Sequence, residues 1–220
     1  AGTFSSDVNE YVPEGNKAIY DETTGKYTIG IDTSGDKAAV AEVNGFGYTT
    51  VQDAVDAIAA TESKSGTVNV IKDSVENVTI PAGVNVTLNL AEGVTLSGGT
   101  EKDTANKSHT ITNNGTLTVT GSGTVENANS GSGALFNNLG ATANLNGSTF
   151  TGTTWYVLKN LGTMTINGAA VTQQDAGSSA IDNGWYGNAS NDCNVSHPGD
   201  DTTATLTIVD GTFSGGMNIV

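Results

Sequence analysis

The chain has 220 residues, enough for one domain with a sizeable core, yet only 36% of them are hydrophobic and 14% are charged. Its net charge is −15, and its eight basic residues are all lysines, so nucleic acid and anionic membrane surfaces are not expected as partners. The single cysteine, Cys193, excludes an internal disulfide, and no apolar run reaches the about 20 residues of a membrane-spanning helix, so membrane insertion is not expected.

The remaining composition favours strands and turns over helices. Glycine occurs 29 times, and Thr, Asn and Val recur throughout the chain. β-Branched side chains suit the pleated surface of a sheet, whereas Asn and Gly accept the left-handed conformations of tight turns. The composition therefore predicts an all-β protein.

Residues 1–47 are predicted to form a first small unit. Within it, the stretch "AIYDETTGKYTIGI" at 18–31 has the pattern of a β-hairpin with a turn at Thr24 and Gly25. A small β element over 18–43 is therefore expected before the main domain, which we place at 48–220.

One helix is predicted, over residues 48–63, "YTTVQDAVDAIAATES". Thr50 followed by Asp53 is similar to a capping box, with Asp in place of the usual Glu or Gln. The apolar positions that recur at helical spacing are Val51, Ala54, Val55 and Ile58. We expect this helix to cover one end of the strands that follow, because an open edge of strands invites aggregation.

From about Thr67 onward, short strands alternate with turns at a regular interval. In "TLTVT", Leu117 and Val119 alternate with threonines, which predicts one inward and one outward face. The turn asparagines are Asn114, Asn138, Asn160 and Asn183, separated by 24, 22 and 23 positions. A period of this length predicts a right-handed parallel β-helix, a solenoid in which equivalent asparagines hydrogen-bond in a ladder.

The order of several segments resembles a known class of repeat protein. "GTFSSDVNEYVPEG", "GKYTIGI", "AEVNGFGYTTVQDAVDAI", "GTVNVIKDSVENVTIPAGVNVTLNL" and "NNGTLTV" are together similar to the pectate-lyase-like (pectin lyase-like) β-helix modules of large surface proteins of Gram-positive gut bacteria. The resemblance implies that residues 2–47 are the tail of one module. It also implies that "GTFSGGMNIV" at 211–220 begins the tail of another, so the partners would include neighbouring modules of a longer chain.

The resemblance raises the question of a polysaccharide-cleaving enzyme. Lyases of this fold use an arginine base, and this chain has no arginine. Glycoside hydrolysis needs two carboxylates that flank the scissile bond. The only local candidate is the segment "HPGDD", with His197, Asp200 and Asp201. A lyase or hydrolase acting on an acidic polysaccharide is therefore kept as the alternative function.

Two kinds of binding residue are predicted. Both tryptophans precede tyrosines, and Trp155, Tyr156, Trp185 and Tyr186 are candidates for stacking on sugar rings, although aromatic side chains also fill the corners of a solenoid. Oxygen ligands in the stretch 187–201 make Asp192, Asp200 and Asp201 weak candidates for calcium, and no other cofactor or metal is expected.

The function predicted from these observations is that of a non-catalytic module. It would act as a rigid stalk and adhesin on a bacterial surface, or in a secreted protein, and would contact glycans of a host or of the diet. The localisation expected is extracellular.

Overall fold

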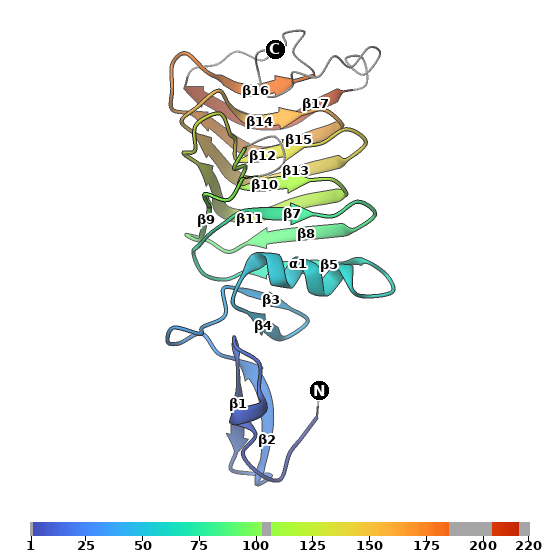
Figure 1. Cartoon of the computed structure of the whole chain (residues 1–220), viewed down its shortest axis with the longest axis vertical. Coiled ribbons are helices and arrows are strands. Elements are labelled where there is room, and N and C mark those ends of the chain that lie inside the picture. Colours follow the sequence, from blue (N-terminus) through green and yellow to red (C-terminus); the bar gives the residue numbers. More distant parts are fainter. Residues whose placement is uncertain (1, 103–106, 185–203, 216–220) are drawn as a thin grey trace.

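A computed structural model describes residues 2–102, 107–184 and 204–215 (Figure 1). Strands dominate these residues, so the prediction of an all-β protein is confirmed. The molecule is elongated: a hairpin lies at one end, and the short strands β3 (Ala41–Val43) and β4 (Phe46–Tyr48) come next. The helix α1 (Val51–Ala59) follows, and further strands are stacked beyond it (Figure 1). Within the described ranges, no helix is long and apolar enough to cross a membrane.

The N-terminal hairpin forms as the sequence predicts. A short 3-10 turn, η1 (Asn9–Tyr11), precedes the antiparallel strands β1 (Asn16–Asp21) and β2 (Lys26–Ile31). Gly25 adopts φ = 66°, a left-handed conformation that suits glycine. Asp21 stabilises the same turn, because its carboxylate accepts hydrogen bonds from Thr23 N (2.8 Å) and Thr24 Oγ1 (2.8 Å).

A pair of hydrogen bonds joins the hairpin to the rest of the chain. The Asn16 side chain donates to the Gly47 carbonyl (2.7 Å) and accepts from the Gly47 amide (2.8 Å). A Cβ on Gly47 would lie 2.2 Å from the Gly15 carbonyl oxygen, so only glycine allows this approach. Gly47 lies in β4 (Phe46–Tyr48), which pairs with β3 (Ala41–Val43), and both strands extend the large sheet rather than the hairpin.

The helix α1 is shorter than the predicted 48–63 but begins where the sequence indicates. Thr50 Oγ1 accepts a hydrogen bond from Asp53 N (3.0 Å), and the Glu76 carboxylate accepts from the first two amides of the helix (2.9 and 3.0 Å). The helix ends at Ala59, and just beyond it Thr61 Oγ1 donates a hydrogen bond to the Ile58 carbonyl (2.7 Å). Its apolar residues pack in the core as predicted: Val51, Ala54, Val55 and Ile58.

Two sheets built mainly of parallel strands make up the rest of the fold. The five-stranded sheet contains β7 (Val78–Ile80), β10 (Ile111–Asn113), β12 (Leu135–Asn137), β14 (Tyr156–Asn160) and β16 (Ser179–Asn183). Besides β3 and β4, the ten-stranded sheet contains β5 (Ser65–Val70), β6 (Ser74–Glu76), β8 (Asn85–Leu90), β9 (Thr95–Gly98), β11 (Thr116–Asn127), β13 (Thr142–Gly152), β15 (Thr163–Gln173) and β17 (Thr205–Gly215).

From β10 onward the chain alternates between the two sheets, so each turn of the chain adds one strand to both; before it, β5 with β6 and β8 with β9 each add two strands to the ten-stranded sheet. We call a strand of the five-stranded sheet and the following strand of the ten-stranded sheet a layer; β10 with β11 is one layer, and β12 with β13 is the next. Leu88, Val119, Leu145 and Ile166 occupy equivalent positions in successive layers, and all four are fully buried. The predicted inward position of Val119 is thus confirmed.

Asparagines form a ladder across four layers, in which Asn113, Asn137 and Asn160 are buried and Asn183 is half-buried. Asn113 donates to Asn137 (2.7 Å), Asn137 donates to Asn160 (2.8 Å), and Asn160 donates to Asn183 (2.6 Å). These residues are in register and are 24, 23 and 23 positions apart.

The predicted ladder was therefore wrong by one residue in its first two layers. Asn114 and Asn138 are only half-buried and make a separate bond of 2.9 Å, so they lie on the outer face beside the ladder. Ile80 occupies the equivalent position in the layer before Asn113, where the ladder ends.

The last described strand, β17, differs from the strands before it. It forms the edge of the ten-stranded sheet, with β15 on one side. Ile208 is 42% exposed, whereas Ile166 at the equivalent position of β15 is fully buried. Among the described residues, no strand pairs with the outer side of β17. The edge of a sheet offers backbone N–H and C=O groups to a further strand.

Candidate functional site

Trp155 is an exposed aromatic residue on the described layers, and it lies in the turn between β13 and β14. Its side chain is 44% exposed. The Lys107 ammonium lies 4.5 Å from the centroid of the ring, a distance typical of a cation–π contact. The backbone is fixed by the Ser179 amide, which donates to the Trp155 carbonyl (2.8 Å). A flat, partly exposed ring held in this way can stack on a planar or apolar ligand surface, including the face of a sugar.

The neighbouring residue, Tyr156, is fully buried, which corrects its prediction as a glycan contact. Its ring lies 5.9 Å from the ring of His109, which in turn stacks on Phe136 at 4.8 Å with an interplanar angle of 10°. His109 is 3% exposed, and its Nδ1 accepts a hydrogen bond from Gly133 N (3.0 Å). Tyr156 therefore agrees with the alternative prediction from the sequence, in which an aromatic side chain fills a corner between layers.

A buried ion pair lies close to this aromatic group. Lys159 Nζ is 2.8 Å from Asp182 Oδ2 and also donates to the Gly184 carbonyl (2.7 Å). The side chains are 0% and 2% exposed. Phe136, Lys159 and Asp182 occupy equivalent positions in three successive layers. Both charges are compensated and shielded from solvent, so the pair organises the sheet and offers no acid or base to a polymer outside.

The other predicted site residues fall outside the described ranges. These are Trp185, Tyr186, the calcium candidates Asp192, Asp200 and Asp201, and the possible catalytic His197. In the part of the chain that the structure covers, no group of three or more His, Cys, Asp or Glu side chains is arranged to hold a metal ion.

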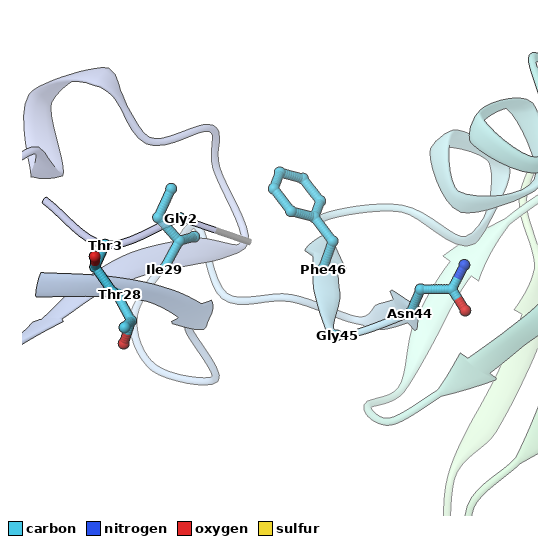
Figure 2. A pocket seen from close by; sticks show the side chains of 7 residues that line it. All are labelled: Gly2, Thr3, Thr28, Ile29, Asn44, Gly45 and Phe46. Carbon is cyan, nitrogen blue, oxygen red and sulfur yellow. The ribbon is translucent and has the colours of Figure 1, made fainter.

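A cavity of about 690 Å³ lies at the N-terminal end of the molecule (Figure 2). One wall comes from the N-terminal segment and β2, and the other from the turn between β3 and β4. Its lining is Gly2, Thr3, Thr28, Ile29, Asn44, Gly45 and Phe46. None of these described lining residues carries a charged side chain.

Comparison of the chain with protein-family models, with curated proteins and with solved structures finds no match. The class that the fold defines is therefore a coarse one: an all-β protein with long parallel sheets whose strands stack in register.

Sequence reasoning missed most of the residues that surround Trp155 and Tyr156. Lys107, His109 and Phe136 come from other layers, and their proximity depends on a register that the sequence leaves open. A signal for the ion pair was present, since Lys159 and Asp182 each directly precede a ladder asparagine. Equivalent positions in adjacent parallel strands are neighbours, and opposite charges there are expected to pair.

Proposed function

We propose that this chain is a non-catalytic module of an extracellular bacterial surface protein, a rigid spacer that presents Trp155 to glycans. The observation that carries the proposal is the register of the layers. From β10 to β16, successive strands of the five-stranded sheet advance by 23 or 24 residues, and an asparagine ladder joins them. Each layer adds about 4.8 Å to such a stack, so repetition of the unit extends the molecule along one axis.

The two sheets correspond, in this proposal, to faces of a right-handed parallel β-helix that α1 covers at its N-terminal end. The alternation of the chain between the sheets supports this arrangement, and so does the position of α1 against the first strands (Figure 1). The sequence resemblance to pectate-lyase-like modules is consistent with the same arrangement. The strong negative charge keeps an exported array soluble.

A non-catalytic role is supported by the chemistry of the described surface. The buried Lys159 and Asp182 neutralise each other, and none of the described residues that line the cavity in Figure 2 has a titratable side chain. Trp155 offers a large, rigid contact area at low entropic cost, and Lys107 orients it. Trp155 is thus the first residue of the described chain to test for glycan binding.

The test is a glycan array with the purified chain, followed by titration of the best ligand. Trp155→Ala should weaken binding about tenfold, equivalent to ~1.4 kcal/mol. Tyr11→Ala is the matched control, because Tyr11 is a 76% exposed aromatic residue at the other end of the molecule and should leave affinity unchanged. Equal affinities for the two variants would remove Trp155 from the binding surface. Calcium is included in one arm, since its effect would direct attention to Asp192, Asp200 and Asp201.

A further inference from the structure

We propose that the β1–β2 hairpin of one module pairs with the outer edge of β17 in the module before it. A single Gly-Thr-Phe-Ser segment then serves as the last strand of one module and as the partner of the next hairpin. This inference rests on the proposed function as a module in an array, and it identifies the surface through which adjacent modules join. The occupant of the β17 edge is thus the hairpin of a second copy.

The segment Gly-Thr-Phe-Ser occurs at both ends of the described chain, at residues 2–5 and 211–214. In the first copy, Phe4 and Tyr27 exchange two backbone hydrogen bonds, each of 2.9 Å, so the segment pairs antiparallel with β2. In the second copy, Phe213 lies opposite Val171, so the segment pairs parallel with β15. The first copy of the segment therefore pairs with the hairpin strand β2, and the second copy pairs with β15 of the stacked layers.

The two partners use opposite edges of the segment. The carbonyl of Gly152 accepts a hydrogen bond from Gln174 in the following layer (2.9 Å), so backbone groups at this position face forward along the stack. Phe150 lies two residues earlier on the same face, and Phe213 is equivalent to Phe150 through Val171. Residues two apart in a strand direct their N–H and C=O groups to the same side. The backbone N–H and C=O of Phe213 therefore point away from β15, toward the outer side of β17. In the first copy of the segment, the equivalent N–H and C=O groups of Phe4 are those that bond Tyr27.

The outer edge of β17 also has the apolar character of an interface. Phe213 is only half-buried, whereas Val171 at the equivalent position of β15 is fully buried. Val209 is 66% exposed. At the opposite edge of the same sheet, the antiparallel pair β3–β4 follows β5, so this chain already ends one side of the sheet with antiparallel strands. An antiparallel hairpin on β17 would end the other side in the same way.

The junction would have a defined geometry rather than act as a free linker. The hairpin is held to β4 by the paired hydrogen bonds between Asn16 and Gly47. Gly2 and Thr3 line the cavity in Figure 2, and in the joined arrangement Gly211 and Thr212 of the preceding module take their places. The cavity would then lie between two modules, with Phe46 on the side of the second one.

The experiment uses a tandem chain in which residues 1–210 are joined directly to residues 2–220, so the two copies share one Gly-Thr-Phe-Ser segment. Hydrogen exchange is followed at the backbone amide of the phenylalanine in this shared segment. We expect its exchange to be at least about 100-fold slower than that of Phe213 at the end of the second copy, which has no following hairpin. The terminal Phe213 is thus an internal control within the same molecule.

Tyr27→Pro in the second copy is the matched variant. Proline lacks the N–H that donates to the Phe4 carbonyl, and its fixed φ does not suit an extended strand. The facing bond, from the shared phenylalanine amide to the carbonyl of residue 27, should therefore open more often, and the protection of that amide should fall. Exchange as fast as that of the terminal Phe213, or protection that survives Tyr27→Pro, would overturn the inference. The buried Val119 amide reports separately on the layers: if it stays protected while the shared segment does not, the junction fails and the spacer proposal stands. Loss of protection at Val119 in the tandem chain would instead contradict the proposal of modules in an array.

Discussion

The asparagine ladder should contribute measurably to stability, and Asn137 is the residue at which to test it. Asn137 donates to the Asn160 side chain (2.8 Å) and to the Thr163 carbonyl (3.0 Å), and it accepts from Asn113 (2.7 Å). Its side chain is fully buried, so water cannot replace these bonds. At about 1 kcal/mol for each hydrogen bond, Asn137→Ala should lower the free energy of unfolding by about 3 kcal/mol.

The neighbouring Asn138 provides the matched control. It is half-buried and donates one side-chain bond to Asn114 (2.9 Å), so water can compensate for its loss. Asn138→Ala should cost about 1 kcal/mol or less. Urea unfolding, with midpoints compared at constant slope, measures both changes. Asn137→Leu separates the loss of hydrogen bonds from the creation of a cavity, because leucine fills a similar volume. Equal destabilisation by the two alanine variants would refute a stabilising role of the ladder.

Three further outcomes follow from contacts described above. Val119→Asp should cost several kcal/mol because it places an unpaired charge in the core, while Thr118→Asp on the outer face should be mild; equal shifts in melting temperature would contradict the register. Gly47→Ala should displace the hairpin, since its Cβ would meet the Gly15 carbonyl, and limited proteolysis should then cut residues 16–31 faster; unchanged cleavage would argue against this contact. Hydrogen bonds from the Thr24 hydroxyl and the Thr23 amide hold the pKa of Asp21 below its ordinary value, so its contribution to the turn is present at neutral pH and lost as the pH falls below about 4. The protection factors of the hairpin amides, which are corrected for the intrinsic pH dependence of exchange, should therefore fall in acid, and Asp21→Asn should remove this dependence.

Much of the fold could be predicted because local patterns of residues determine the faces of the strands, the beginning of the helix and the turn of the hairpin. The alternation in "TLTVT" identifies Leu117 and Val119 as inward residues, and both are fully buried. Thr50 marks the beginning of the helix through its cap, and the left-handed Gly25 marks the turn of the hairpin. These signals are local, so they do not depend on which strands later become neighbours.

The asparagine ladder shows a feature that such local signals do not predict. Two of its layers carry Asn-Asn pairs, and the sequence alone does not say which member points inward. A slip of one residue exchanges the faces of a strand, and the structure selects Asn113 and Asn137 because Leu135 and Ile111 must share their face. Composition and alternation fix the faces of long strands better than those of three-residue strands such as β10 and β12.

The candidate site was less predictable than the fold, for the same reason. Trp155 and Tyr156 are adjacent in sequence, yet one is 44% exposed and the other is fully buried. Their difference arises from His109, which packs on Tyr156, and from Lys107, which lies over Trp155. These two partners precede the tryptophan by more than forty residues, and only the stacking of layers brings them together.

The asparagine ladder also limits how the length of this protein changes in evolution. A deletion of one residue within β12 would turn Asn137 outward and interrupt the ladder at that layer. Loss or duplication of one whole layer between β10 and β16, where equivalent asparagines are 23 or 24 residues apart, keeps each asparagine opposite the next. Insertions and deletions of whole layers should therefore be the length changes that preserve the ladder, and the reach of the molecule would change in discrete steps.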